Sequence, residues 1–318
     1  MYRLAFAALA LGAASLAAPP AVAQSYPVPT VTLVTHSSPG GGSDVFLRVL
    51  AKHLQPKMGV AFAVENVRGG SGARAVSRVA TAPPDGSVLY ATTPTYIQTS
   101  LLSQVEHSWD TLMPVVNVFL DPEVVFVRTE SPFKTFAEAM AHAKANPAKQ
   151  KWGAANPASL ERIAMEKLNR MVGARAAIVS HEGGRDMLVN VLNGTLDLGI
   201  GEIQEFRPQL EAKQIRLIAV LTEKRLPDMP DLPTAKEQGI DLVVTKFRGL
   251  AGPKGLPENV LKAWDAGIRA VLADPAYQEE YKKENLVVAF KDHTEAGAFT
   301  NEVAADIAKS LHELGVAK

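Results

Sequence analysis

The sequence predicts an α/β fold of two domains. Short β-rich apolar runs alternate with helical stretches along the chain, and glycine-rich turns stand where strands give way to helices. The alternation is typical of parallel sheets covered by helices. About 295 residues follow an N-terminal segment that resembles a signal peptide, which is more than one hydrophobic core usually serves.

The first 23 residues have the composition of a secretory signal peptide. Residues 1–3 form a basic start, residues 4–18 are an apolar run too short to span a membrane, and Ala21-Val22-Ala23 is a small-residue cleavage site. The chain contains no cysteine, so disulfides, thiol nucleophiles and thiolate metal sites are excluded. We expect an exported, periplasmic protein whose stability comes from its core.

Strands and helices follow from the periodicity of apolar residues. The predicted strands are 31–34, 62–64, 88–91, 115–119, 124–127, 177–179, 196–200, 217–221, 242–244 and 286–290. The clearest predicted helices are 45–54, 73–79 and 160–172. Ser43 or Asp44 is expected to cap the first of these helices, and Gly173 to end the last.

The two-domain division depends on where the chain crosses between domains, because neither an internal repeat nor a low-complexity linker marks a boundary. The best candidates are the Asp121-Pro122 junction and the segment 245–247, since each lies beside a predicted strand. We expect one discontinuous domain of residues 24–123 and 247–318, and a second domain of residues 124–246.

Two glycine-rich turns carry the predicted chemistry. Residues 39–44 (PGGGSD) and 181–186 (HEGGRD) each precede a predicted helix. A helix start leaves about four backbone N–H groups unpaired and has a partial positive charge, so a turn without bulky side chains can receive an anion there. Two such turns facing each other would bind an acidic ligand.

Other loops add polar groups that could reach the same ligand. Residues 92–96 follow a strand with Thr93, Thr95 and Tyr96, while Asn156 and Ser159 stand before the helix at 160. In parallel α/β sheets, ligands bind beyond the carboxyl ends of strands, where such loops lie. A third glycine-rich turn, residues 68–72, is either part of this group or a structural turn.

Three side chains near the turns could have either a ligand-binding or a structural role. His36 could donate to a ligand or be a structural histidine, and Arg185 could pair with a ligand carboxylate or with its acidic neighbours. Phe247 could line an aromatic pocket, although an aromatic residue more often belongs to the core.

Several function classes fit the sequence poorly. The first turn lacks both the Gly-Lys-Ser/Thr ending of a P-loop and the spacing of a dinucleotide site, and the balance of 33 basic and 33 acidic residues disfavours nucleic acid. Residues 69–73 (GGSGA) depart from a nucleophile elbow, and the scattered histidines form no metal motif. We expect no metal, no cofactor and no enzyme, with a periplasmic hydrolase of a small acidic ester or amide as the alternative.

The order of motifs resembles the Bug family of periplasmic receptors, the solute-binding components of tripartite tricarboxylate transporters. The resemblance extends from residue 26 to the C-terminal helix. Its stretches are 38–44 (SPGGGSD), 64–72 (VENVRGGSG), 82–86 (APPDG), 192–198 (LNGTLDL), 216–220 (RLIAV), 233–239 (PTAKEQG) and 249–253 (GLAGP).

The resemblance implies a Venus-flytrap fold, type II-like, with two α/β domains joined by two crossing strands and closing on a small carboxylate. It further implies that a membrane permease receives the solute from a monomeric receptor, although a signalling partner is an alternative. The loops that would hold the ligand carboxylate are 39–44 and 180–185; the second departs from the Tyr-Lys-Gly-Gly pattern common in the family, and Glu182 is expected to point outward.

The predicted ligand-binding residues come from both turns and the neighbouring loops. They are His36, Ser38, Pro39, Gly40, Gly41, Gly42, Ser43, Asp44, Thr93, Thr95, Tyr96, Asn156, Ser159, His181, Gly183, Gly184, Arg185 and Phe247.

Overall fold

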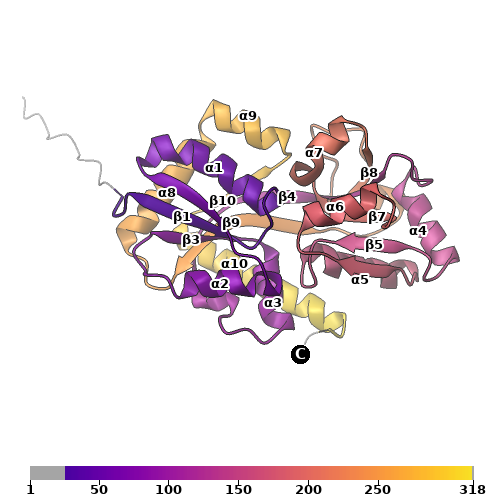
Figure 1. Cartoon of the computed structure of the whole chain (residues 1–318), viewed down its shortest axis with the longest axis horizontal. Coiled ribbons are helices and arrows are strands. Elements are labelled where there is room, and N and C mark those ends of the chain that lie inside the picture. The colour runs from indigo at the N-terminus through magenta and orange to yellow at the C-terminus, as the bar shows by residue number, and fades with distance from the viewer. Residues whose placement is uncertain (1–25, 317–318) are drawn as a thin grey trace, which may run out of the picture.

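The computed structural model describes residues 26–316 as two α/β halves lying side by side (Figure 1). The predicted signal peptide, residues 1–23, lies outside the described residues. Within residues 26–316, no helix combines the length and the apolar character needed to cross a bilayer.

The first half is built around a mixed sheet of strand order β2-β1-β3-β9-β4, with β10 also paired to β4. β1 is parallel to β2 and β3, whereas β9 and β10 run antiparallel to their neighbours. Its strands are β1 (Thr30–Thr35), β2 (Ala61–Asn66), β3 (Val88–Thr92), β9 (Thr245–Pro253), β10 (Val287–Lys291) and part of β4 (Leu112–Arg128).

Helices cover both faces of this sheet. One face carries α1 (Gly42–Met58), α8 (Glu258–Leu272) and α9 (Pro275–Lys283), and the other carries α2 (Ala73–Ala80), α3 (Pro94–Leu102) and α10 (His293–Glu313). Side chains alternate along β1, so that Leu33 packs beneath α1 and Val34 beneath α2. Short 3-10 turns, Gly70–Gly72 and Trp109–Thr111, complete this half.

The second half has its own sheet, of order β6-β5-β7-β4, with β8 also paired to β4. Its elements are α4 (Phe136–Ala145), β5 (Lys151–Ala154), α5 (Leu160–Val172), β6 (Ala177–Ser180), α6 (Gly184–Leu192), β7 (Leu198–Glu202), α7 (Ile203–Glu211), β8 (Ile215–Val220) and the 3-10 turn Lys236–Gln238. Val125 faces α4 and α5, whereas Phe126 faces α6 and α7.

Two strands connect the halves. Residues 112–122 of β4 pair with β9, and residues 123–128 of the same strand pair with β7 and β8. Pro122, which has no N–H to donate to a ladder, stands opposite Thr245 where β4 changes partners. A two-domain fold with two connecting strands follows, with α10 also reaching the second half through contacts of Leu311 and Ile163.

Most predicted elements form, and the exceptions lie near the connection. The strands predicted at 115–119 and 124–127 are one continuous strand, β4. No strand forms at 242–244; the strand is β9, which begins at Thr245 and includes the residues expected to be a hinge segment. The strand β5 had no counterpart among the predictions.

The helix ends show one wrong prediction. Neither Ser43 nor Asp44 caps α1: the cap position is Gly41, and both residues lie in the first turn of the helix. Gly173 does end α5, in the left-handed conformation with φ +68°.

Candidate functional site

The turn between β1 and α1 is held by its own half of the molecule. The Gly40 N–H, in a backbone with φ +80°, donates to Asp44 Oδ2 at 2.8 Å. Asn66 Nδ2 donates to Asp44 Oδ1 at 3.0 Å and to the Ser37 carbonyl at 2.9 Å. Burial alone would raise the pKa of Asp44, but hydrogen bonds from Arg48, Gly40 and Asn66 hold it below its usual range. Asp44 therefore stabilises the turn instead of facing a ligand.

The turn between β6 and α6 is open at its flanks. Glu182 and Arg185 are exposed, while Gly183 is buried against Ser38 of the first half and Gly184 against Glu205 of its own half. His181 has its Nδ1 3.2 Å from the Ala154 carbonyl and its Nε2 3.1 Å from Asn190, so both ring nitrogens have partners within the second half. Gly183 is therefore the glycine of this turn that contacts the first half directly.

A carboxyl group of the chain itself lies between the two turns. Glu205, in the first turn of α7, accepts a hydrogen bond from the Gly42 N–H at 2.7 Å through Oε1. A methyl group on Gly184 would overlap Oε2 of the same side chain. The two glycine turns thus face each other, as the sequence predicted, with the Glu205 carboxyl between them.

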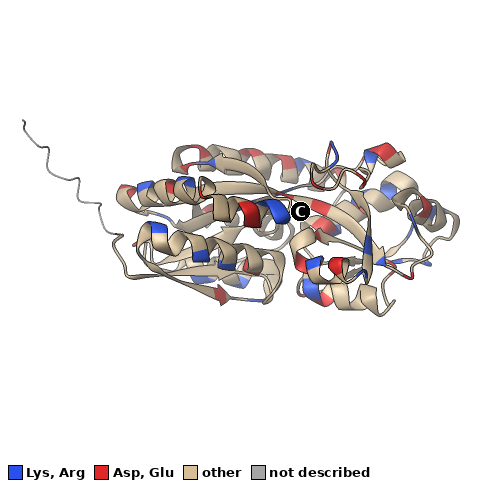
Figure 2. Cartoon of the chain, turned by 90° about the horizontal axis from the view of Figure 1, so that it is seen from above, with Lys and Arg blue, Asp and Glu red and all other residues tan. Residues whose placement is uncertain are grey.

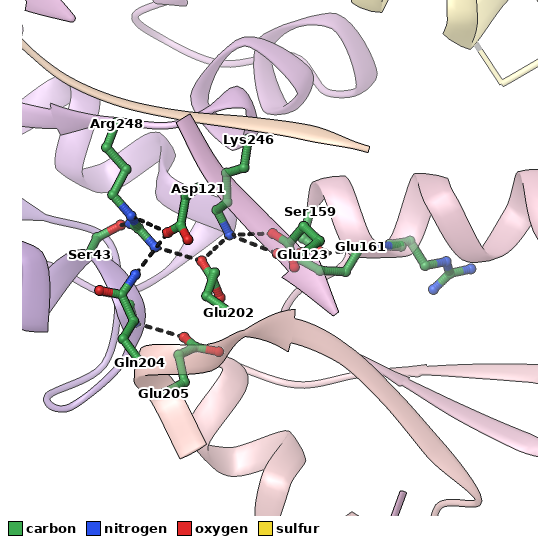
Figure 3. Close-up of polar contacts among 12 residues, drawn as sticks. Ser43, Asp121, Glu123, Ser159, Glu161, Glu202, Gln204, Glu205, Lys246 and Arg248 are labelled. Carbon is green, nitrogen blue, oxygen red and sulfur yellow. Dashed lines mark hydrogen bonds and ion pairs between the residues drawn. The ribbon is translucent and has the colours of Figure 1, made fainter. Parts of the chain in front are cut away.

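Behind this contact lies a buried network of charged groups (Figure 3). Arg248 donates to Asp121 Oδ2 at 2.5 Å, to Glu202 Oε1 at 2.8 Å and to Ser43 Oγ at 3.0 Å. The network joins residues of β4, β7, β9 and α1, so it ties both halves together at the connection.

Lys246 occupies the centre of three carboxylates. Its Nζ lies 2.8 Å from Glu161 Oε1 and 3.2 Å from Glu123 Oε1, and it also contacts Glu202. Oxygens of these three glutamates lie within 4.8 Å of one another, a spacing that could hold a metal ion. The ammonium group of Lys246 supplies the cation at this position.

The buried acidic groups differ in the direction in which their pKa is shifted. Burial raises the pKa of Glu123 and of Glu205 well above the usual range, which favours the neutral form of both carboxyls. Burial would do the same to Glu202, but Lys246 and Arg248 outweigh it and lower the pKa of Glu202 to about 2. Glu202 is therefore the carboxylate that stays ionised, while burial favours the neutral form of its neighbour Glu205.

His36 lies at the mouth of the same region as a neutral imidazole. Loss of hydration, followed by the nearby Lys246 and Arg248, lowers the pKa of His36 to about 4. Its Nδ1 is 2.7 Å from the Tyr90 hydroxyl, which orients the ring. The structure fits both roles predicted for His36, as a ligand donor or as a structural histidine, because Tyr90 contacts Nδ1 and leaves Nε2 without that contact.

A small cavity of about 30 Å³ lies between the turns, with room for about one or two water molecules. Eight of the predicted residues line it: His36, Gly42, Ser43, Thr93, Thr95, Asn156, Gly183 and Gly184. The cavity is too small for a dicarboxylic acid, so capture of a solute requires the halves to separate or Glu205 to move.

The other predicted residues lie outside the cavity lining. Ser38, Pro39, Gly40, Gly41 and Asp44 shape the first turn, and Ser159 caps α5 by accepting from the Arg162 N–H at 3.2 Å. The Arg185 side chain packs against Gly40. Tyr96 belongs to the core beneath α3.

Phe247 borders a different and larger cavity. This space of about 440 Å³ lies between α3, α5 and α10, where Phe247 packs edge-on against Phe299. Phe247 therefore contacts the core of the first half and not the space between the turns.

Five charged residues of the cavity were not among the predicted site residues: Glu161, Glu182, Glu202, Glu205 and Lys246. Glu202 and Glu205 lie at and just beyond the end of β7, and Glu161 follows the loop that contains Asn156. The rule that places ligands beyond strand ends would have found the first two, had it been applied to carboxylates as well as to glycines. Glu182 is exposed, as expected, but it also borders the cavity.

Comparison with known proteins identifies the family. The family model of the tripartite tricarboxylate transporter family receptor matches residues 46–316. A Cupriavidus necator protein, named UPF0065 protein in gbd 5'region, is 28% identical, with 98% of this chain and 96% of the relative covered. Protein BugT of Bordetella pertussis is 24% identical, with 92% and 91% covered.

A solved structure agrees in fold. An R. palustris protein with adipate superposes with a TM-score of 0.88 at 25% identity, covering 92% of this chain and 99% of the other. The resemblance predicted from the sequence motifs is confirmed. This chain belongs to the receptor family of tripartite tricarboxylate transporters.

Proposed function

We propose that this protein captures a small organic acid in the periplasm, with one carboxylate held between the turns before α1 and α6, and delivers it as a monomer to the membrane permease of a tripartite tricarboxylate transporter. One observation carries the proposal: the Glu205 carboxyl lies between these turns and accepts from the Gly42 N–H at 2.7 Å. A solute carboxylate fits the same position once Glu205 leaves it.

The energetics are consistent with a receptor. Hydrogen bonds to a charged group contribute roughly 1.5 to 3 kcal/mol each, and a helix start adds roughly 0.3 to 1 kcal/mol. Micromolar affinity needs about 8 kcal/mol net. Several contacts at the two turns reach that level after the costs of ordering the ligand and closing the halves.

Closure would occur about the two connecting strands. We propose domain boundaries at residues 123–124 and 246–247, within two residues of Pro122 and Thr245, where β4 changes partners and β9 begins. Each domain then contributes one turn, so a bound carboxylate has differential contacts with the closed state. The R. palustris relative with adipate supports a carboxylate as the class of solute.

Calorimetry and solution scattering on the mature protein test the proposal. Mono-, di- and tricarboxylates are titrated, with inorganic phosphate and glucose as controls. At least one acid should bind and raise the melting temperature by several degrees at 100 times its dissociation constant. Saturating the protein with this acid should lower its radius of gyration, because the ligand-free state is expected to be open. Binding of phosphate or glucose without any acid contradicts the carboxylate assignment.

A further inference from the structure

A second cavity lies between the halves, apart from the space between the glycine turns. It measures about 440 Å³ and is bordered by α3 and α10 of the first half and by α5 of the second. Small-molecule sites typically measure roughly 300 to 1,000 Å³. Neighbouring side chains of β9 divide between the two spaces, since Lys246 lines the one between the turns and Phe247 borders the other. The two cavities share no lining residue and are therefore separate sites.

Most of the wall of this second cavity is apolar. The α5 helix contributes Leu160 and Ile163, the α10 helix contributes Val303 and Ile307, and Phe247 comes from β9. Leu160, Val303 and Ile307 are only partly buried, so apolar surface between the halves remains in contact with water. Covering this surface with the apolar part of a ligand is favourable.

The polar groups of the same cavity are mostly acceptors. Glu302 and Asp306 lie one turn apart on α10 and are exposed, and within residues 26–316 neither carboxylate forms an ion pair. Gln98 of α3 is 1% exposed, and its Oε1 has no hydrogen-bond partner among the described residues. The wall has one basic side chain, Lys167, whose Nζ donates to Ser310 Oγ at 3.1 Å. These groups favour a ligand whose polar end is cationic and donates hydrogen bonds.

From this arrangement we infer that the cavity is a second ligand site, which takes a small apolar amine and stabilises the closed state. The apolar body covers the walls on α5 and α10, and the ammonium group donates to Gln98 and to the carboxylates of Glu302 and Asp306. Because the walls come from both halves, the bound amine has contacts that only this arrangement of the halves supplies. The amine has no carboxylate for the glycine turns, so this site does not depend on the proposed function.

A matched amine and alcohol provide the test. Calorimetry on the mature protein compares 4-phenylbutylamine with 4-phenyl-1-butanol. At low salt the amine should bind at least about threefold more tightly, and the advantage should shrink at high salt. Absence of amine binding overturns the site, and equal or tighter binding of the alcohol overturns the assignment of an amine.

Solution scattering tests the link to closure. Saturating 4-phenylbutylamine should lower the radius of gyration of the protein in the absence of any acid. An unchanged radius despite proven binding overturns the stabilisation of the closed state. Neither measurement requires an acid, so failure of the amine leaves the proposed function standing, and failure of every acid leaves this site standing.

Substitutions on α10 assign the binding to this cavity. Val303→Trp fills the space and should weaken amine binding by about tenfold or more, whereas Ala305→Trp is the control at an exposed position outside the lining. The double change Glu302→Gln and Asp306→Asn should remove the advantage of the amine over the alcohol. Glu295→Gln, exposed in the first turn of the same helix and outside the lining, should leave it unchanged. Melting curves report whether each variant is folded, and wild-type binding by folded Val303→Trp overturns the inference.

Discussion

The two glycine turns look alike in sequence but are held in different ways. The turn before α1 is fixed by Asp44, which accepts from the Gly40 N–H, Asn66 and Arg48 and has a side chain only 4% exposed. In the turn before α6, the corresponding Asp186 is 50% exposed and its ion pair is with Arg68 of the other half. One side of the proposed anion site is therefore preformed, whereas the other depends on the halves coming together.

The two turns also differ in what a side chain would meet at their glycine positions. A side chain on Gly42 would meet Arg248 Nη2 at 2.5 Å and Glu202 Oε1 at 2.9 Å, within the buried network. A side chain on Gly184 would meet the end of Glu205, which can swing aside. Gly42 thus leaves room for the buried network, whereas Gly184 leaves room only for the Glu205 carboxyl, the position that we propose for the ligand carboxylate.

The largest effect should come from placing a carboxylate on each turn. Gly42→Asp and Gly184→Asp should both weaken binding of any acid by about 100-fold or more, because the new carboxylate takes the anion position. Gly42→Asp should also lower the free energy of unfolding by about 3 kcal/mol, since it breaks a buried ion-pair network. Calorimetry and urea unfolding measure the two quantities.

Gly297→Asp serves as the control for this pair. Gly297 lies in α10, and a Cβ added there would meet no neighbouring atom within 4 Å, so binding and unfolding should both stay close to wild type. Equal loss of stability in Gly42→Asp and Gly184→Asp would contradict the difference between the turns.

An intermediate effect is expected from the groups that support each turn. Asp44→Asn should cost about 2 kcal/mol at pH 7, because three donors lose a charged acceptor. The pKa of Asp44 is lowered on folding, so its contribution is present above the unfolded value near 4 and is lost as the pH falls through the folded value. Urea unfolding at pH 7 and pH 3 should therefore show a smaller difference from wild type at pH 3.

Asp186→Asn is the matched change in the second turn. Its carboxylate is half exposed, so the expected cost is below about 0.5 kcal/mol at either pH. A cost at Asp186 as large as that at Asp44 would show that the second turn is also preformed.

The sequence predicts what depends on local pattern. The apolar runs of β1 and β3, the amphipathic α5 and the left-handed Gly173 at its end all follow from residues near one another in the chain. The facing of the two turns was also predictable, because both follow parallel strands. Figure 2 shows, in contrast, acidic and basic residues on most elements. Their order in the sequence does not separate buried charged residues, such as Glu202 and Arg248, from exposed ones.

What escaped prediction depends on contacts between distant segments. β9 contains Lys246 and Arg248, and charged residues in a short run argue against a buried strand. They are tolerated because Asp121, Glu161 and Glu202 supply their partners from β4, α5 and β7. The same pairing hides Glu161 and Lys246, for which no local signal marks a side chain that faces a cavity, whereas the position of Glu202 and Glu205 at the end of β7 was an available signal.

The smallest expected effect concerns the ion pair between Arg68 of the first half and Asp186 of the second turn. Arg68 and Asp186 lie 3.3 Å apart across the halves with side chains 43% and 50% exposed, so the pair is worth at most about 1 kcal/mol. Arg68→Ala should weaken acid binding by no more than about fivefold, because only the closed state contains the contact. Calorimetry at low and high salt should show the loss shrinking as salt screens the pair.

Arg78→Ala gives the comparison that isolates closure. Arg78 pairs with Glu65 at 3.4 Å, and both side chains are 40% exposed, but this pair lies entirely within the first half. It is matched to Arg68 and Asp186 in distance and exposure, yet it is present whether the halves are open or closed. Arg78→Ala should therefore leave affinity unchanged at every salt concentration. A similar loss in both variants would mean that Arg68 acts through the general charge of the first half, and that the second turn needs no ion pair to reach the first.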